Sequence, residues 1–531
     1  MAIFTTARLG LDLNANVSTV LLTSTGVLLL TLLVRRVFTV TLDENEPPAL
    51  HPRIPVIGHL IGLITQGGTF FATLSTQTNL PAVSLPILNG KMYTIFDPHL
   101  LQGAFRNRIL TVKPYMVKFL KAEVSYPSKY DDLVQTSTFM DDTIKCLHSS
   151  MTAQNIHRMN ANALRYLSGV LNALPKEGDV EIPNLWLWVR EELTVATCEA
   201  LYGSHNPFKS GSTLVDDLWT FEAKLSNFLL GLAPSITAPA AYKARSRLQA
   251  ALKEYYSNSH DTDEHAANLV SECAQIIRQH GIAAEDAGYF GIPILHVSTA
   301  NSIPVAYWFF SEVFSKPDLV QELREECEGA ITWDKKKKEA TVNLDVLAEK
   351  CPLLFSCYRE TIRTNNQTPI SRRVTSTTTI TDNKGTIYTL QADTDLQCSM
   401  GALHRNTTIW GSDANIFNPY RFLKMDAEPA TANKTRRAAF VPFGGGQHLC
   451  PGRTFAQAEN LGFVLTLVLG FDVSPIQRGK GWEEVVLPGK MELNLGQALH
   501  KPVNEGEGFG VRIGRRRGWE GVQWQFVSGS N

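Results

Sequence analysis

The stretch Phe443-Gly-Gly-Gly-Gln-His-Leu-Cys-Pro-Gly-Arg-Thr-Phe-Ala456 decides how the rest of the chain is interpreted. Three consecutive glycines permit a backbone path that residues with a Cβ atom avoid, so the main chain can pass close to a flat or bulky group. Cys450 follows, just before an apolar helical pattern. The first turn of a helix presents unpaired N–H groups and a positive dipole end, which should lower the pKa of the thiol. The pattern therefore predicts a metal-binding thiolate at Cys450.

The same stretch resembles the haem-binding signature of the cytochrome P450 family, Phe-x-x-Gly-x-Arg-x-Cys-x-Gly. Phe443, Gly446, Cys450 and Gly452 match it at the right spacing, and His448 stands where the family has an arginine. In the family that arginine contacts a haem propionate, so this contact depends on His448 or another cation. The resemblance implies haem b with Cys450 as the axial iron ligand, which favours O–O cleavage. The alternative is a glycine-rich turn around a structural cysteine.

Two further motifs precede the cysteine in the order that the family has them. Glu360-Thr-Ile-Arg363 lies in a helical pattern, and a spacing of three places both charges on one helix face. Phe417-Asn-Pro-Tyr-Arg-Phe422 is the second motif. The resemblance implies that Glu360, Arg363 and Arg421 form a buried cluster that braces the cysteine stretch.

Cationic residues elsewhere are candidates for the haem propionates. Arg372 lies 12 residues after Glu360 and resembles the arginine that reaches a propionate in the family, with Arg373 as a second candidate. The tryptophan–arginine helix motif that often supplies another contact is not evident, so we consider His157 and Arg158 as substitutes.

A long apolar segment, roughly Ala284 to Phe314, has the length and character of a central buried helix. Pro293 and Pro304 would each remove a backbone hydrogen bond and kink it. The interruption falls beside Ala300-Asn301-Ser302, and a broken helix next to polar residues is typical of a functional site. The alternative is a packed helix with satisfied polar groups.

The three residues at this interruption are the predicted catalytic residues. The family usually has an acid–alcohol pair here that relays protons, and Ala300, Asn301 and Ser302 replace it. Ala-Asn, followed two residues on by Ile-Pro, resembles the branch of sterol 7α-hydroxylases and prostacyclin synthase. The resemblance implies that Asn301 and Ser302 order water or substrate on the haem face opposite Cys450.

The N-terminal region predicts where the protein sits. Val17 to Val34 is an 18-residue stretch without a charged residue, and as a helix it would span about 27 Å, close to the thickness of an endoplasmic reticulum bilayer. Arg35 and Arg36 follow, which the positive-inside rule places in the cytosol. We expect a single-pass anchor in the endoplasmic reticulum membrane with a cytosolic catalytic domain; a cleavable signal peptide is the alternative.

The remaining chain is divided by its proline content and helical patterns. Prolines after the anchor stiffen the chain, so we assign 1–40 as membrane anchor, 41–58 as proline-rich hinge and 59–531 as the haem-thiolate catalytic domain. Short β-like runs at 81–88 and 92–96 flank an Asn-Gly turn signal, and helical patterns dominate afterwards. The predicted fold is mainly α with a minor β-sheet region. The resemblance implies the cytochrome P450 fold, preceded by one transmembrane helix.

Composition excludes some classes of function. The 531 residues carry a formal net charge of -1, which argues against nucleic acid as a partner. The eight cysteines are scattered without a CxxC pair, which is typical of a reducing compartment.

An apolar, loop-like stretch, 228–239, separates two helical patterns. The resemblance implies a mobile substrate entrance that rests on the membrane, and an ordinary buried helix turn is the alternative.

The resulting hypothesis is a microsomal haem-thiolate monooxygenase. It would hydroxylate an apolar small molecule, such as a sterol, a terpenoid or another secondary metabolite, with O₂ and electrons from NADPH through NADPH–cytochrome P450 reductase. The alternative is a haem-thiolate isomerase or dehydratase that acts on a peroxide or an oxygenated substrate without O₂ or reductase. A third class is a haem-binding sensor without catalytic activity.

Overall fold

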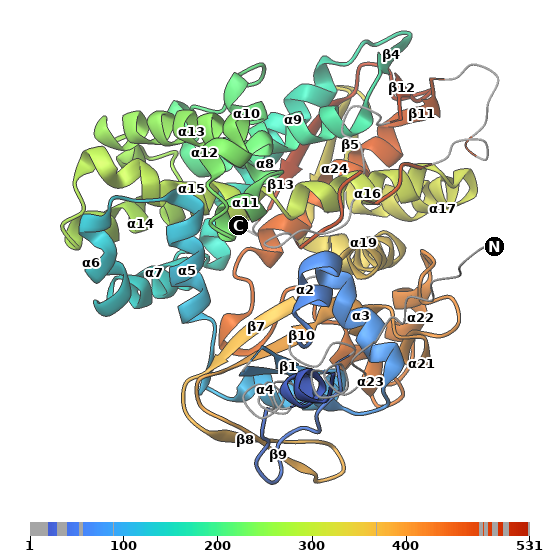
Figure 1. Ribbon diagram of the computed structural model, residues 1–531. Coiled ribbons are helices and arrows are strands. Elements are labelled where there is room, and N and C mark those ends of the chain that lie inside the picture. The colour runs from blue at the N-terminus through green and yellow to red at the C-terminus, as the bar shows by residue number, and fades with distance from the viewer. Residues whose placement is uncertain are drawn as a thin grey trace, which may run out of the picture.

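The computed structural model describes residues 20–28, 40–52, 57–88, 90–367, 369–476, 482, 487–490, 498–502 and 509–528. Helices dominate one side of the molecule and a five-stranded sheet lies on the other side (Figure 1). The prediction of a mainly α fold with a minor β-sheet region is confirmed.

The longer helices form the body of the molecule. Their bounds are α3 (Gly68–Gln77), α4 (Pro98–Arg106), α5 (Lys113–Val124), α7 (Phe139–Ser149), α8 (Ala153–Ala173), α9 (Leu185–Tyr202), α10 (Thr213–Glu222), α13 (Pro239–Ser257), α14 (Asn268–Gln279), α15 (Ala287–Thr299), α16 (Ser302–Phe314), α17 (Pro317–Cys327), α19 (Pro352–Asn365) and α24 (Arg453–Gly470). The shorter ones are α2 (Leu60–Gln66), α6 (Asp131–Thr136), α11 (Leu225–Leu229), α12 (Pro234–Thr237), α18 (Leu347–Lys350), α20 (Met400–His404), α21 (Thr407–Trp410), α22 (Arg421–Ala427) and α23 (Lys434–Ala439).

Within the described residues the strands form four small sheets. The five-stranded sheet has the order β1-β2-β10-β7-β3, with β1 (Ala82–Ile87), β2 (Gly90–Ile95), β3 (Leu110–Thr111), β7 (Pro369–Val374) and β10 (Thr394–Ser399). Two three-stranded sheets combine β11 (Phe471–Pro475), β12 (Val511–Arg515) and β4 (Asp179–Ile182), and β13 (Gln523–Val527), β6 (Glu339–Asn343) and β5 (Ile331–Asp334). The last sheet pairs β8 (Thr378–Thr381) with β9 (Ile387–Leu390).

The predicted hairpin is present in the five-stranded sheet. β1 and β2 pair antiparallel, with Ile87 opposite Gly90, as the turn signal between them predicts. β2 also pairs in parallel with β10, which follows some three hundred residues later in the sequence. This pairing places the start of the chain against the region that precedes the cysteine stretch.

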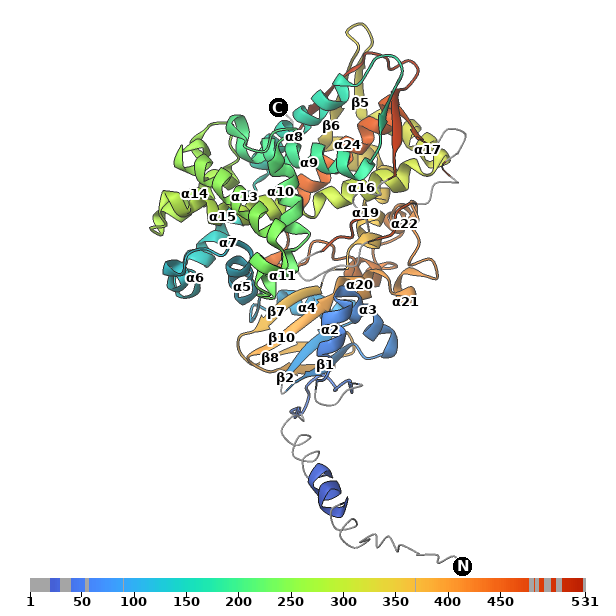
Figure 2. The ribbon, with the colours of Figure 1, turned by 45° about the horizontal axis from the view of Figure 1, so that its top comes forward.

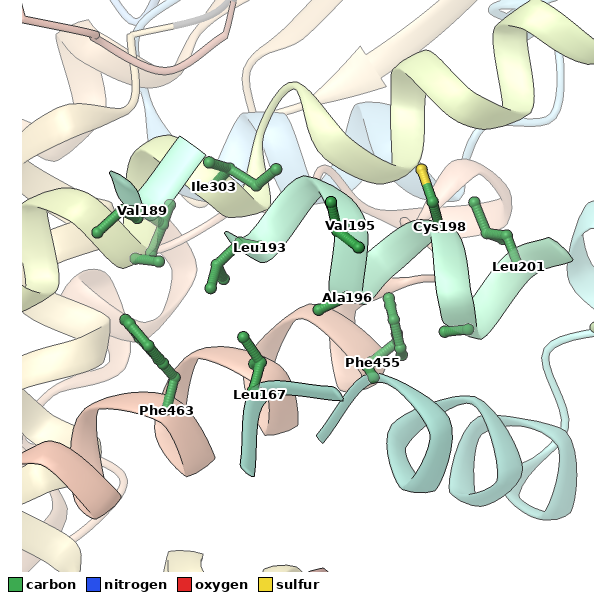
Figure 3. Close-up of a cluster of buried hydrophobic side chains, with 14 of the residues drawn as sticks. Leu167, Val189, Leu193, Val195, Ala196, Cys198, Leu201, Ile303, Phe455 and Phe463 are labelled. Atoms are coloured by element: carbon green, nitrogen blue, oxygen red, sulfur yellow. The ribbon is translucent and has the colours of Figure 1, made fainter. Parts of the chain in front are cut away.

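Part of the core lies where α9 meets its neighbours. Figure 3 shows Leu193 and Ala196 of α9 near Phe455 and Phe463 of α24, with Ile303 of α16 close by. All five side chains are buried. Because α24 begins immediately after the cysteine stretch, this packing fixes that stretch to the body of the molecule.

The central apolar segment forms two helices instead of one. α15 ends at Thr299 and α16 begins at Ser302, so the break falls at Ala300 and Asn301, where the sequence predicts an interruption. Pro304 explains it, because proline has no N–H to donate to the carbonyl four residues earlier, that of Ala300. Pro293 lies inside α15 and does not end it.

The N-terminal prediction falls partly outside the described residues. Residues 20–28 are helical and exposed (dark blue in Figure 2), whereas 17–19 and 29–34 of the apolar stretch lie outside the described part. No helix in the described ranges is both long and apolar enough to cross a membrane. In the segment assigned as the hinge, Glu46 is buried and accepts a hydrogen bond from the Tyr93 hydroxyl at 2.6 Å, so this part is attached to the sheet.

Candidate active site

The cysteine loop, residues 443–452, needs glycine because it packs closely against α4. Gly446 has φ +65, and an added Cβ would overlap the carbonyl oxygen of Phe105. A Cβ on Gly445 would overlap the ring of the same residue. Gly452 has an ordinary φ of −80, and its Cβ would meet only the Cys450 sulfur, at 4.0 Å. The close approach that the glycine run predicts therefore involves Phe105, which sequence analysis did not identify.

Cys450 lies three residues before the start of α24. Its N–H donates to the carbonyl of Phe443 at 3.0 Å, which closes the loop. Burial raises the pKa of the Cys450 thiol, while the N–H groups of Gly452 and Arg453 act in the lowering direction. The prediction of a lowered pKa is therefore wrong for the protein alone, because burial outweighs the helix end. A bound metal ion reverses this balance, since a coordinating thiol loses its proton.

The bracing cluster consists of Glu360, Arg363 and Arg421. The Glu360 carboxylate accepts from Arg363 Nη2 at 2.7 Å and from Arg421 Nε at 2.9 Å. The side chains of Glu360 and Arg363 have no exposed surface, and the side chain of Arg421 is 8% exposed. The acid thus joins α19 to the start of α22. A buried acid that accepts hydrogen bonds from two guanidinium groups fixes both elements relative to each other.

The bracing cluster is connected to the cysteine loop through His404. Arg363 Nη1 donates to the carbonyl of His404, and the Val441 N–H donates to His404 Nε2 at 3.3 Å. Burial lowers the pKa of His404 to about 3, so its ring is neutral and accepts this bond. Asn366, just past α19, donates to the carbonyl of Pro442 at 3.0 Å. The residues that enter the loop are therefore held from α19 and α20.

Strand alternation separates the two predicted arginine candidates. On β7 the Arg372 side chain is buried, whereas Arg373 points outward and pairs with Asp395 at 2.7 Å. The Arg372 guanidinium donates to the Ser371 carbonyl, and within the described ranges no carboxylate pairs with it. Burial lowers the pKa of Arg372. A buried cation without an acid partner favours an anionic group beside it.

His448 faces the same region as Arg372. Burial, followed by the charges of Arg372 and His148, lowers the pKa of His448 to about 4. The ring is therefore neutral and does not replace the positive charge of the family's arginine. Its buried Nε2 has no hydrogen-bond partner within the described ranges. His148, on α7, is a neighbour that sequence analysis missed.

The proposed substitutes for the tryptophan–arginine motif have other partners. His157 hydrogen-bonds to Ser528 at 2.7 Å. Arg158 donates to the Ala266 carbonyl at 3.0 Å and also to the side chain of Asn268. Within the described residues neither side chain hydrogen-bonds to Arg372 or His448, so the structure gives no support for these two residues as propionate ligands.

The break between α15 and α16 opens onto a cavity of about 90 Å³, which we call the α15 cavity. Ala300 and Asn301 line it, and Asn301 is exposed. Val297, one turn earlier, is 56% exposed although α15 is otherwise largely buried. Ser302 does not line this cavity: it is buried, and its hydroxyl donates to the Ser298 carbonyl. The structure thus brings two of the three predicted catalytic residues together and turns the third away.

Polar residues that sequence analysis missed also line the α15 cavity. His296 lies on α15 and Glu222 on α10. His296 pairs with Glu123, and Glu222 pairs with Lys501. The only sequence signal was a histidine inside an apolar helix, because the partners are distant in the chain.

These residues fit haem. A thiol lies at the end of a tight loop. In the described part of the chain, the buried Arg372 guanidinium has no acid partner and His448 Nε2 has no hydrogen-bond partner, and both suit the propionates of a flat, acidic group. Cys450 would hold the iron, and Arg372 with His448 would meet the carboxylates.

Comparisons with known proteins agree with this arrangement. The family model described as Cytochrome P450 matches residues 284–491. A cytochrome P450 monooxygenase of Gibberella zeae is 38% identical over 497 residues, which cover 94% of each chain. The cytochrome P450 monooxygenase nodJ of Hypoxylon pulicicidum is 24% identical over 498 residues, 91% of this chain and 93% of the relative. A 5-beta-cholestane-3-alpha,7-alpha-diol 12-alpha-hydroxylase of Sus scrofa is 25% identical over 246 residues, 45% of this chain and 49% of that protein.

Proposed function

Because this chain belongs to the cytochrome P450 family and is a monooxygenase, we propose that it oxidises an apolar small molecule in secondary metabolism, with haem held by Cys450. The observation that carries this proposal is the cysteine loop, in which Cys450 is fixed by Phe443 in front and by α24 behind. When bound, the haem supplies the activation of O₂.

The chain's own residues would bind the haem and orient a water or the substrate. Arg372 offers a buried positive charge to the haem carboxylates, and His448 offers a neutral N–H group beside it. On the opposite side, Asn301 can both donate and accept hydrogen bonds but cannot ionise, so it suits positioning a water or a substrate oxygen. Ser302 bonds back to Ser298, and we propose for it a role in fixing the helix break.

An apolar substrate suits the rest of the α15 cavity. Phe119, Val297, Ala300, Ala498 and Leu499 supply apolar surface there. The branch of sterol 7α-hydroxylases and prostacyclin synthase remains part of the proposal, supported by the distant similarity to a steroid hydroxylase and by Ala-Asn at the helix break. Sterols, terpenoids and other secondary metabolites all fit these features. The fungal relatives named above favour secondary metabolism.

We also propose that the protein is anchored in the endoplasmic reticulum membrane. The apolar stretch within residues 1–40 supplies the anchor, 41–58 the hinge and 59–531 the cytosolic catalytic domain. Exposed apolar side chains in and around α11 and α12 support a membrane-facing entrance, with Leu230 52%, Leu232 50% and Ile236 79% exposed. NADPH–cytochrome P450 reductase would supply the electrons.

The second candidate function, an isomerase or dehydratase, is favoured by one observation. Asn301, at the helix break, cannot ionise, so the usual acid of the family is absent there. The decisive assay gives purified protein a substrate identified by comparing metabolites of cells with and without it, and omits the reductase. We expect turnover to require NADPH, reductase and O₂ together. Turnover without reductase would overturn the monooxygenase proposal.

A further inference from the structure

His296 and Glu123 form a buried acid–imidazole pair beside the α15 cavity. His296 Nδ1 lies 2.7 Å from Glu123 Oε1, and the two side chains are 5% and 0% exposed. Stacking fixes the imidazole, since the Phe119 ring is parallel to it at 6.2 Å and the Phe221 ring meets it edge-on at 6.4 Å. Burying such a pair beside the α15 cavity costs desolvation free energy that the single contact offsets only in part.

The geometry determines which nitrogen can act. A carboxylate oxygen accepts hydrogen bonds, so the contact with Glu123 Oε1 suits a hydrogen on His296 Nδ1. The imidazole lines the cavity, and Nε2 has no partner in the described part of the chain, which leaves it as the nitrogen for a molecule in the cavity. Glu123 Oε2 is buried without a partner there, although Arg245 donates to the backbone carbonyl of Glu123 at 3.1 Å.

A monooxygenase consumes protons in each turnover. In the balanced reaction RH + O₂ + 2e⁻ + 2H⁺ → ROH + H₂O, one oxygen atom enters a C–H bond and the other leaves as water with both protons. Among the described residues, the titratable side chains that line the cavity are His296 and Glu222. Glu222 is engaged by the Lys501 ammonium, with both side chains 3% exposed. His296 is therefore the group suited to exchange a proton with the cavity.

We propose that His296 is a catalytic residue that delivers protons from Nε2 to the oxygen being reduced, and that Glu123 is its positioning residue. Glu123 holds Nδ1–H and balances the charge of the imidazolium, while water from solvent returns each proton to Nε2. Among the described residues, Glu222 lines the same cavity and pairs with Lys501, and Arg245 donates to the backbone carbonyl of Glu123. The inference rests on the monooxygenase function and deepens it.

The test uses full-length, haem-loaded protein with reductase and ¹⁸O₂, without an organic substrate. Reduced oxygen then leaves either as peroxide, with two electrons and two protons, or as water, with four of each. We expect His296→Gln to lower the share of oxygen recovered as water at least about tenfold, since a general acid contributes about 10²–10⁴-fold. His280→Gln is the matched control, because His280 pairs with Asp142 at 2.9 Å away from the cavity.

Variants of Glu123 separate positioning from a merely structural role. Gln at this position still accepts from Nδ1–H, so Glu123→Gln should retain more water formation than Glu123→Leu. Histidine-selective ¹⁵N NMR of the diamagnetic ferrous–carbonyl form, assigned with His296→Gln, gives a readout independent of turnover. We expect hydrogen on Nδ1 in the wild type and in Glu123→Gln, and loss of this preference in Glu123→Leu.

Several results would overturn the relay. They are an unchanged water share in His296→Gln, a wild type that releases all oxygen as peroxide, or hydrogen on Nε2 alone. If reductase drives no oxygen uptake even in the wild type, the monooxygenase function itself fails. Normal uptake with an unchanged water share refutes only the role of His296.

Discussion

The cysteine side and the α15 cavity differ in how their polar groups are held. On the cysteine side, Glu360 binds two arginines, and these bind backbone carbonyls in turn, so removing one group leaves several without partners. At the cavity, Asn301 is exposed, and His296 has one ring nitrogen unengaged within the described residues. The first region is therefore built for rigidity, whereas the second keeps polar groups available for chemistry. Substitutions should therefore affect stability on the first side and chemistry on the second.

The largest loss of stability should come from Glu360→Ala. It would leave the buried Arg363 without its acid partner, and breaking such a network costs about 3–5 kcal/mol. We expect little folded, haem-containing protein, measured by yield and by urea unfolding. The control is Glu181→Ala, which removes an acid whose side chain is 55% exposed from its pair with Arg512 and should cost less than about 1 kcal/mol. Similar losses in both variants would contradict the distinction.

Gly446→Ala should have the next largest effect. Alanine in the left-handed conformation costs about 1–2 kcal/mol, and its Cβ would also overlap the Phe105 carbonyl. We expect a loss of at least about 2 kcal/mol in the free energy of unfolding together with weaker haem retention. Gly169→Ala, in α8 with open space around it, should be neutral or stabilising. An intact Gly446→Ala protein would show that the loop tolerates a different path.

Asp413→Asn should have a smaller effect, although Asp413 pairs with the same Arg421 as Glu360. Its side chain is 41% exposed, and exposed pairs contribute about 0–1 kcal/mol. The Arg421 guanidinium lowers the pKa of Asp413 to about 2. Because the pKa of Asp413 is lower in the folded protein than its unfolded value of 3.8, the ionised carboxylate stabilises the fold at pH values above 3.8. This stabilisation is lost as the pH falls through about 2. The difference in urea midpoint between wild type and Asp413→Asn should therefore shrink between pH 5 and pH 3; a constant difference would contradict this.

Asn301→Leu should have the smallest effect on stability and a large effect on catalysis. Because Asn301 is exposed in the cavity, the free energy of unfolding should change by less than about 0.5 kcal/mol. Without a group that positions water, NADPH should still be consumed with reductase present, but peroxide should replace product. Peroxide release and product formation are measured together, and unchanged coupling would remove Asn301 from the catalytic residues.

The sequence predicted the cysteine side better than the cavity, for a physical reason. The loop, the Glu360 motif and the hairpin of β1 and β2 depend on residues at short, characteristic spacings, and the helix break follows from Pro304. Glu123 and His296 are 173 residues apart, and Glu222 and Lys501 are 279 apart, so only tertiary packing brings the members of each pair together. The pKa of Cys450 was predicted in the wrong direction because burial is set by the whole fold.

The central claim is that Cys450 is the axial thiolate, and the ferrous–carbon monoxide spectrum tests it most directly. The wild type should show the red-shifted band of a thiolate-bound haem. Cys450→Ala should lose the band or the haem, and Cys450→His should keep haem without this band, since imidazole donates less electron density than a thiolate. Cys398→Ala, which changes a buried cysteine on β10, should retain the band. A Cys450→Ala protein with the unaltered red-shifted band would contradict the account.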